Sequence, residues 1–447
     1  MKVSKIKSNF IFEDIRLNAG YFLNEDALNS MKLETNRNRC ISLDQVANVW
    51  NPPIFKRQFC EKTERSIPYC QSSDVTNLLE GSDVYIYKEQ ALKVNSVVKE
   101  NQILVTGFGT VGNTRLVNEL SSGISYANNV CRIEASEKLP FGYIYSFLTS
   151  KYGRSQLNKN ASGSVVRYIE APGIKKTLIP VLSEEKQQQI HQLIVEASEL
   201  RVEANRLLKE AQNKITSKLD FEKSTIYQKT SITDIITSHQ KRFESQYHKS
   251  IGSNYRDRIL NSNHILLKDA SEDIFRPGIF KRNYVKQGVD FLGGSDITKS
   301  IPDSDKKLSK RNTPNFDELT LKEDWILVTC GGTIGTSVLV NSYLATKLAS
   351  QHILRVIPKG IKTGYLFAFL SSDIGVKVIQ SFTYGSVIPQ IEPHHLELVP
   401  IPLLNDEIMN QIDSDVMRYK FNINEAILKE NQAIALIEKE IDLWQVS

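Results

Sequence analysis

The chain has 447 residues, which is long for one domain and suits two to four. Its composition, 40% hydrophobic and 24% charged, is typical of soluble globular proteins, and no run of 18 apolar residues predicts a membrane span. The net charge of +5 permits an anionic partner such as nucleic acid without requiring one. The five cysteines lack C-x-x-C spacing, so we expect free thiols in a reducing, cytoplasmic location and no zinc site.

The chain repeats itself, in order, at an offset of 222 to 226 residues. The matched stretches, in chain order, are 16–22 with 242–248, 53–57 with 278–282, 73–75 with 295–297, 103–112 with 326–335, 130–133 with 353–356, 142–143 with 364–365, 163–170 with 385–392, and 179–182 with 401–404. Chance would not preserve this order, so we interpret it as an internal duplication.

Each copy is predicted to form a mixed α/β globule with more sheet than helix. Short β-branched and aromatic runs such as Ile103–Thr106 are separated by Gly, Pro, Asn and Ser, as is typical of strands. The pairs Gly142-Tyr143 and Gly364-Tyr365 each introduce a short apolar helix. We expect globules at 1–182 and 221–404 and helical regions at 183–220 and 405–447, with the linker between the copies at 219–238.

Each copy ends in a long helix with an apolar stripe. The stripes include Ile190, Leu193, Leu200 and Leu207 in the first helix, and Ile427, Ile434, Ile437 and Ile441 in the second. Steps of three and four residues indicate an a/d seam in the first helix, and the second is less regular. One such helix cannot bury its stripe alone, so we predict that the two pack together. The alternative is that each packs only on its own globule.

The glycines of Gly107–Gly112 satisfy the G-x-G-x-x-G pattern of dinucleotide-binding loops, and Glu134 lies where that fold needs an acid. The following residues, however, look like a second strand, and the repeat has Cys330 in place of the first glycine. A phosphate cradle needs that glycine, whereas a β-hairpin needs only a tight corner. The repeat therefore favours a hairpin over a nucleotide site.

Other enzyme-like motifs are weak. Asn51-Pro-Pro-Ile54 is similar to the tetrapeptide with which amino-methyltransferases hold a base, but its repeat, Arg276-Pro-Gly-Ile279, loses the Asn, and no S-adenosylmethionine loop accompanies it. His394-His395 lacks a third metal ligand, and adjacent residues in a strand would face opposite ways, so we expect a polar pair in a loop. Glu170 and Glu392 each lie close to a proline and look structural. We predict no catalytic residues, no metal and no cofactor in this chain.

The matched loops carry basic and polar side chains that suit contact with DNA phosphates and bases. The candidates are Lys56, Arg57, Ser162, Ser164, Arg167, Lys281, Arg282, Lys306, Lys307, Lys310, Arg311, Ser386 and Gln390. For the cluster 306–311 a solvated surface is the alternative, because Asp303 and Asp305 lie beside it.

The length of the predicted helices fits the spacing of DNA half-sites. A helix of about 30 residues spans roughly 45 Å, and domains that contact two DNA half-sites lie roughly 34 Å apart, or a multiple of that distance. Because the two copies differ in most of their side chains, each would read a different half-site, and the whole DNA site would be asymmetric and bipartite.

This layout resembles the specificity subunit of type I restriction-modification systems over essentially the full chain. The resemblance rests on Arg16/Tyr21 and Arg242/Tyr247, the strand Ile103–Thr106 with its glycine loop, Gly163-Ser164 and Gly385-Ser386, and the Ile-Pro-x-Leu segments before the helices. Lys186–Ile190 is similar to the family's Glu-Gln-x-x-Ile helix start with Lys for Glu, whereas Ile408–Ile412 departs from it.

The resemblance implies two target recognition domains that alternate with two helical regions packed as an antiparallel coiled coil. It also implies a subunit without chemistry of its own, which reads double-stranded DNA through the major groove. Two methyltransferase (modification) subunits would supply S-adenosylmethionine chemistry, and restriction subunits would add ATP- and Mg-dependent translocation and cleavage. Two alternatives remain: a specificity subunit of a fused restriction-methylation or other phage-defence methyltransferase system, and a coiled-coil scaffold that binds only protein.

Overall fold

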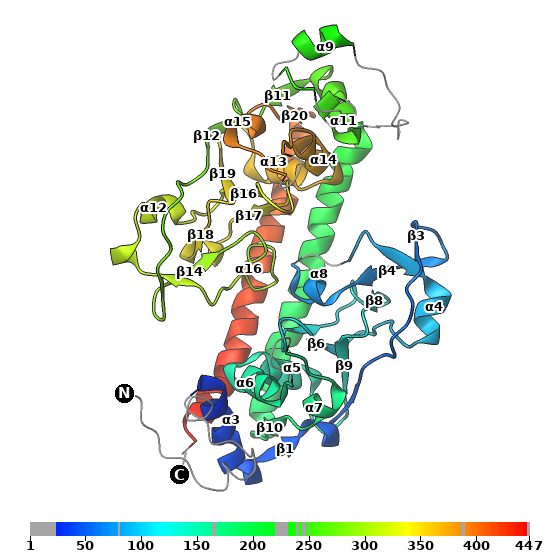
Figure 1. Ribbon diagram of the computed structural model, residues 1–447, viewed down its shortest axis with the longest axis vertical. Coiled ribbons are helices and arrows are strands. Elements are labelled where there is room, and N and C mark those ends of the chain that lie inside the picture. The colour runs from blue at the N-terminus through cyan, green and yellow to red at the C-terminus, as the bar shows by residue number, and fades with distance from the viewer. Residues whose placement is uncertain are drawn as a thin grey trace. The chain divides into compact units, whose positions relative to one another are not determined.

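The computed structural model describes residues 24–78, 81–162, 167–219, 231–237, 241–243, 247–248, 250–385 and 389–444. They form two compact units, which divide at Val202/Glu203 and at Asn424/Glu425, so that the first unit takes both ends of the chain. Each unit contains one globule and one half of each of two long helices, α8 (Glu184–Leu219) and α16 (Asp406–Asp442) (Figure 1). The Arg16/Tyr21 pair lies outside the described residues.

Unit 1 has a main four-stranded sheet of order β2-β9-β6-β7, a smaller one of order β3-β5-β4-β8, and the strand pair β1-β10. Its strands are β1 (Cys40–Ser42), β2 (Ala47–Trp50), β3 (Phe59–Cys60), β4 (Ser66–Cys70), β5 (Tyr85–Tyr87), β6 (Ile103–Thr106), β7 (Thr114–Leu116), β8 (Ser125–Tyr126), β9 (Val130–Ala135) and β10 (Leu178–Pro180). Its helices, besides half of α8 and of α16, include α3 (Glu25–Thr35), α4 (Lys88–Lys93), α5 (Phe141–Thr149), α6 (Lys151–Asn160) and α7 (Ala171–Lys175).

Unit 2 repeats this plan with sheets of order β12-β19-β16-β17, β13-β15-β14-β18 and β11-β20. Its strands are β11 (His264–Leu266), β12 (Ser271–Phe275), β13 (Tyr284–Val285), β14 (Val289–Leu292), β15 (Lys307–Leu308), β16 (Ile326–Thr329), β17 (Ser337–Leu339), β18 (Leu348–Ala349), β19 (Ile353–Pro358) and β20 (Pro400–Pro402). Its helices include α9 (Ile232–Thr237), α11 (Ile251–Leu260), α12 (Phe316–Leu319), α13 (Thr363–Leu370), α14 (Asp373–Ser381) and α15 (Pro393–Leu396). The strands correspond one to one between the units, which confirms the predicted duplication and mixed α/β class.

The glycine loop is the corner of a β-hairpin in both units. Strand β6 pairs antiparallel with β7, and β16 pairs in the same way with β17. The matched glycines Gly109 and Gly332 have φ of 75° and 77°, and Gly112 and Gly335 have φ of 86° and 89°. This left-handed backbone favours glycine. Neither Gly107 nor its counterpart Cys330 has a positive φ, so the backbone at this position does not require glycine. A Cβ on Gly107 would, however, lie 2.5 Å from the carbonyl oxygen of Ile169, so the two units differ in how closely the chain packs here.

A buried arginine joins the main sheet to the small sheet in each unit. Arg132 on β9 donates to the carbonyl oxygen of Tyr126 on β8 at 2.6 Å and to that of Ser96 at 2.9 Å. Its counterpart Arg355 on β19 donates to the carbonyls of Ala349 on β18 and Ser350. Burial lowers the pKa of both guanidinium groups. The carbonyl oxygens offset the cost of burying these cations and fix the angle between the sheets.

The Gly-Tyr pairs dock the short apolar helix onto a long helix. A Cβ on Gly142 would lie 2.8 Å from Nδ1 of His191 on α8, and one on Gly364 would lie 2.8 Å from the carbonyl oxygen of Asp413 on α16. Only glycine permits this approach without a shift of neighbours. The adjacent hydroxyls, of Tyr143 and Tyr365, donate to the carbonyl oxygens of Pro180 and Pro402. In each unit the Gly-Tyr dipeptide therefore connects the short apolar helix to the long helix and to the strand that precedes the long helix, β10 or β20.

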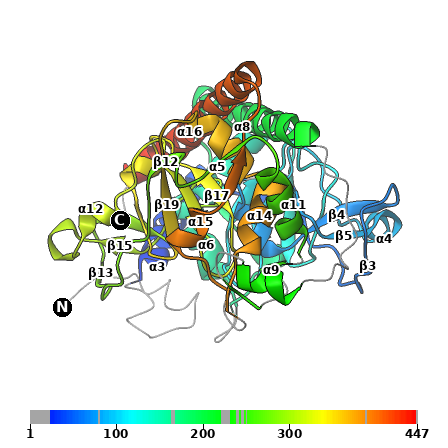
Figure 2. The same cartoon turned by 90° about the horizontal axis from the view of Figure 1, so that it is seen from above.

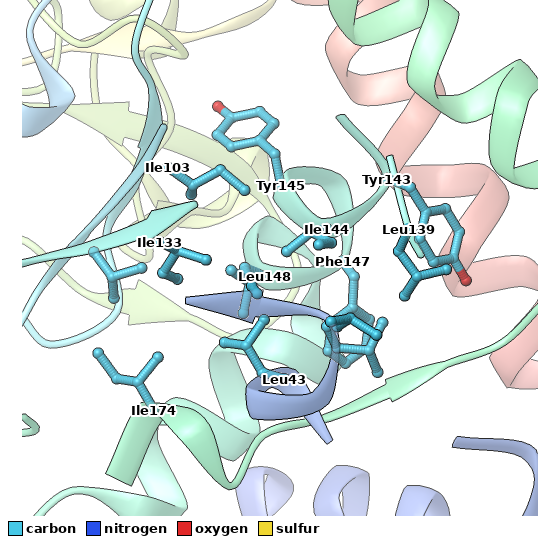
Figure 3. Close-up of a cluster of buried hydrophobic side chains, with 14 of the residues drawn as sticks. Leu43, Ile103, Ile133, Leu139, Tyr143, Ile144, Tyr145, Phe147, Leu148 and Ile174 are labelled. Atoms are coloured by element: carbon cyan, nitrogen blue, oxygen red, sulfur yellow. The ribbon is translucent and has the colours of Figure 1, made fainter. Parts of the chain in front are cut away.

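The main core of unit 1 lies between its large sheet and α5. Figure 3 shows Ile103 and Ile133 of the sheet near Ile144 and Leu148 of α5. The same buried cluster extends to the long helices, through Ile190, Ile194, Ala433, Ile437 and Ile441. The globule and the long helices therefore share one hydrophobic core, which stabilises both.

Within each unit the two long helices lie side by side and antiparallel (Figures 1 and 2). In unit 1, Lys186 pairs with Glu440 at 2.6 Å, and Lys429 pairs with Glu196 at 2.7 Å. In unit 2, Lys214 pairs with Asp415 at 2.8 Å. Of the predicted seam, Ile190, Leu207, Ile427, Ile437 and Ile441 are buried, and Leu193, Leu200 and Ile434 are half-buried. The predicted pairing is confirmed, and the helices also pack on the globules.

Across the described ranges, no helix combines the length and apolar character that crossing a membrane would require. All five cysteines lie within these ranges, and none forms a disulfide.

Candidate nucleic-acid interface

In unit 1 several loops meet at one end of the main sheet. Trp50 at the end of β2 lies opposite Arg132, and Thr106 at the end of β6 lies opposite Val130, the first residue of β9. The segments that follow β2 and β6 and precede β9 are therefore neighbours. We call residues 51–58, 107–112, 128–129 and 167–171 the first sheet end.

Hydrogen bonds hold these segments together. The Asn51 side chain donates to the carbonyl oxygen of Asn128 at 3.0 Å and accepts from the backbone N–H of Ala171 at 2.9 Å. Gly107 donates to the carbonyl oxygen of Asn129 and accepts from Ile169, both at 2.8 Å. The Asn51 amide is thus engaged on both sides within the fold, as expected for a structural loop rather than a base-holding motif.

Unit 2 builds the same end from different side chains. Arg276 takes the place of Asn51: its Nε donates to the carbonyl oxygen of Gln351 at 2.8 Å, and its Nη1 pairs with Glu392 at 2.5 Å. Cys330 donates to the carbonyl oxygen of His352 and accepts from Ile391, both at 3.1 Å. We call residues 276–283, 330–335, 351–352 and 389–395 the second sheet end.

Each sheet end carries one of the predicted basic pairs. Phe55 and Phe280 anchor the two segments by packing on the cores of the small sheets. The next residues, Lys56 and Lys281, are exposed. Neighbouring side chains orient the arginines that follow. Arg57 donates to the hydroxyl of Tyr69 at 3.0 Å, and Arg282 donates to Oε1 of Gln351 at 2.8 Å. Each unit therefore presents one exposed ammonium group beside a positioned guanidinium.

The predicted serine loops also arise at the sheet ends. Ser162 and Tyr168 exchange two backbone hydrogen bonds, at 2.8 and 2.9 Å, and Tyr384 and Gln390 do the same at 3.0 and 2.9 Å. The tips between them lie outside the described residues, and with them Ser164 and Ser386. Arg167 is exposed and donates to the carbonyl of Asn158.

The sequence did not reveal an aromatic pair at the first sheet end. Phe108 and Tyr168 stack with ring centroids 5.5 Å apart, and both remain more than one third exposed. Phe108 and Tyr168 also form an isolated β-bridge. The equivalent bridge in unit 2 joins Gly331 to Gln390, neither of which has an aromatic ring. A flat, exposed aromatic surface on one copy and an amide on the other can contact different bases.

The basic cluster 306–311 lies on the small sheet of unit 2, at β15 and the turn after it. Lys307 pairs with Asp290, which Lys347 also contacts at 2.7 Å. Burial raises the pKa of Asp290, but the hydrogen bonds from Lys307 and Lys347 outweigh this and lower it. The charge of Lys307 is therefore balanced inside the unit. Lys306, Lys310 and Arg311 are exposed.

The histidine pair lies in the short helix α15, which Pro393 begins, and not in a loop. The His395 ring is buried, and its Nδ1 accepts from the backbone N–H of Glu392 at 2.9 Å. Glu392 and Glu170 are the residues before α15 and α7, which is a structural position. The described residues contain no group of three His, Cys, Asp or Glu side chains that could hold a metal ion.

Comparison with known protein families finds the same duplication. The family model of the type I restriction modification DNA specificity domain matches the chain twice, at residues 39–216 and 258–436. No curated protein matches the chain.

Solved structures similar to this chain include two specificity subunits. The S subunit of a type I restriction-modification system from M. genitalium is 13% identical with a TM-score of 0.35, over 90% of this chain and 94% of that chain. The HsdS subunit from Thermoanaerobacter tengcongensis is 14% identical with a TM-score of 0.29, over 91% and 97%. A chain from a structure of a type I R-M system is 15% identical with a TM-score of 0.29, over 90% and 97%.

Proposed function

The chain belongs to the family of type I restriction-modification DNA specificity subunits, which are non-catalytic DNA-recognition subunits, and we propose that it reads a bipartite, asymmetric site on double-stranded DNA. The observation that carries this proposal is the duplicated sheet end. The two ends share a backbone frame and a Lys-Arg pair but differ in the side chains around it. A shared backbone frame suits contact with DNA phosphates, which are the same in every sequence. Differing side chains suit contact with the bases of two different half-sites.

The proposed DNA contacts at each sheet end centre on the Lys-Arg pair, in which both lysines are exposed. Lys56 and Lys281 bind phosphates as mobile point charges, whereas Arg57 and Arg282 are held for bidentate contact with a phosphate or a guanine. Further contacts come from Ser162, Ser164 and Arg167 in the first copy, Ser386 and Gln390 in the second, and the exposed Lys306, Lys310 and Arg311. Each copy reads its own half-site, with recognition domains at 1–182 and 221–404.

We assign the helical regions, 183–220 and 405–447, to docking of two modification subunits and of restriction subunits. S-adenosylmethionine, ATP and Mg²⁺ are bound by those partners in this proposal. Support comes from the paired helices, which share the hydrophobic core of the first globule and contact the second globule through Phe367, stacked on Tyr419 of α16. They can therefore position a bound partner relative to DNA. The chain itself supplies recognition and position, and we assign its place of action to the cytoplasm.

Methylation mapping of the source cell, with and without this gene, tests the proposal. We expect one bipartite motif, two short half-sites separated by an unspecified spacer, to lose adenine methylation when the gene is deleted. Binding of the chain with its modification subunit should favour a duplex carrying that motif and weaken steeply with salt. An unchanged methylome, together with equal binding of all duplexes at physiological salt, would contradict the proposal.

A further inference from the structure

Two isoleucines at matched positions are the most exposed large hydrophobic side chains among the residues that the structure describes. Ile54 is 86% exposed and Ile279 is 83% exposed, and both precede the Phe-Lys-Arg triplet of their sheet end. A single exposed isoleucine is ordinary on a protein surface. That the two highest values fall on twin positions of a duplicated segment requires a common reason.

The residues on either side of each isoleucine are anchored to the fold, so that the isoleucine side chain is held in an outward direction. In each copy a buried proline, Pro52 or Pro277, comes two residues before the isoleucine. The phenylalanine after it turns inward and packs on the small-sheet core. In unit 1 the segment is also held by Gln90, whose amide donates to the carbonyl oxygen of Lys56 at 2.5 Å. The isoleucine therefore projects from an anchored backbone.

An isoleucine at the tip of an anchored segment is suited to an apolar contact with a binding partner. Its β-branch leaves few rotamers, so little side-chain entropy is lost when it touches a partner. Removing its exposed apolar surface from water is favourable whenever the partner offers an apolar group. The partner must therefore present an apolar group at the tip of this segment.

The charges beside the isoleucines identify that partner. The segments 53–57 and 278–282 each carry one lysine and one arginine and no acidic residue. Such a segment attracts a polyanion, and the apolar group that duplex DNA exposes in its major groove is the C5-methyl of thymine. A docking surface for a protein would not need the repeated Lys-Arg pair beside each isoleucine.

We propose that Ile54 and Ile279 each contact a thymine methyl group in the half-site read by their own unit, which makes them specificity-determining residues. This inference rests on the proposed function and deepens it. The flanking lysine and arginine hold the DNA backbone or a neighbouring base, and the isoleucine adds a preference for thymine over cytosine at one position.

Selection from a pool of randomised duplexes tests this inference with the full chain assembled with its modification subunit. The proteins compared are the wild type, Ile54→Ala, Ile279→Ala and, as a matched control, Ile232→Ala on α9, where the isoleucine is 70% exposed. Each sheet-end variant should lose about fourfold in its preference for thymine at one position of one half-site, as expected for about one buried methyl group. The control should select the wild-type motif.

Replacing that thymine with deoxyuridine, which lacks the methyl group, completes a double-mutant cycle. The replacement should weaken wild-type binding about fourfold and leave the matching isoleucine variant unchanged. If the wild type selects a motif and the isoleucine variants select the same motif with the same thymine preference, this inference is wrong and the proposed function stands. If the variants lose assembly with the modification subunit but keep base preference, the isoleucines bind protein and the inference is again overturned. If the wild type selects no motif, the proposed function itself fails.

Discussion

Arg201 on α8 donates a hydrogen bond to Glu430 on α16 at 2.6 Å, and the two side chains are only 11% and 5% exposed. The other carboxylate oxygen of Glu430 accepts from the hydroxyl of Tyr145 on α5. The counterparts in unit 2, at an offset of 222 residues, are all buried and have no charge: Ile423, Leu208 and Phe367. One position of the duplicated fold is thus built from a polar network in unit 1 and from apolar packing in unit 2.

Breaking the polar network should cost more than replacing it. Glu430→Gln leaves the Arg201 cation buried without its counter-ion, and we expect the free energy of unfolding to fall by about 3 kcal/mol. The triple variant Tyr145→Phe, Arg201→Ile and Glu430→Leu copies the unit 2 solution and should cost less than about 1 kcal/mol. Chemical denaturation of both variants measures the difference. A triple variant as unstable as Glu430→Gln would contradict this account.

The seam between the long helices should tolerate no charge. Leu207 on α8 is 3% exposed, whereas Phe421 on α16, in the same unit, is 62% exposed. Leu207→Asp would bury a carboxylate without a partner, and we expect a loss of about 3 kcal/mol or more in the free energy of unfolding. Phe421→Asp, the matched control, should change it by less than about 0.5 kcal/mol. Denaturant midpoints measure both, and equal losses would count against a buried seam at Leu207.

Most of the fold was predictable because each motif occurs twice, and the second copy tests the interpretation of the first. The loss of a glycine at Cys330 identified the Gly107–Gly112 loop as a hairpin, and its pairing confirmed it. The buried arginines were not predictable. Arg132 and Arg355 occupy strand positions where a charged residue normally indicates a solvent-facing side chain. Only the tertiary structure brings the carbonyl oxygens of a second sheet around them.

The candidate site was predictable in part. The repeated Lys-Arg pairs indicated the right segments, since a matched loop with matched charge is visible in sequence. The stack of Phe108 on Tyr168 was not, because it joins two hairpins that are 60 residues apart and occurs in one copy only. The loop expected at His394 was wrong because Pro393, with Glu392 before it, begins a helical turn.

Unit 2 should lose stability as the pH falls from 6.5 towards 4. Burial lowers the pKa of His395 from 6.5 to about 4, and the positive charges of His394 and Arg242 add to this effect, which Glu392 partly opposes. In that window the unfolded chain binds a proton that the folded chain does not, so stability is full above pH 6.5 and decreases below it.

The variant His395→Asn keeps an acceptor for the N–H of Glu392 but cannot titrate. We expect its free energy of unfolding to fall less between pH 7 and pH 5 than that of the wild type, as measured by denaturant unfolding at both values. Parallel losses in the two proteins would show that other groups cause the acid sensitivity.

The two kinds of lysine in unit 2 should differ in their contribution to DNA binding. Lys281 is exposed at the second sheet end, whereas the charge of Lys307 is balanced by Asp290. If Lys281 contacts a phosphate, Lys281→Ala should lower the slope of log binding constant against log salt by about one and weaken binding to all sequences alike. Lys307→Ala, with the same change in formal charge, should leave the slope unchanged because its ammonium group releases no counter-ion from DNA. Fluorescence anisotropy over a range of salt concentrations measures both slopes, and equal slopes for the two variants would remove Lys281 from the interface.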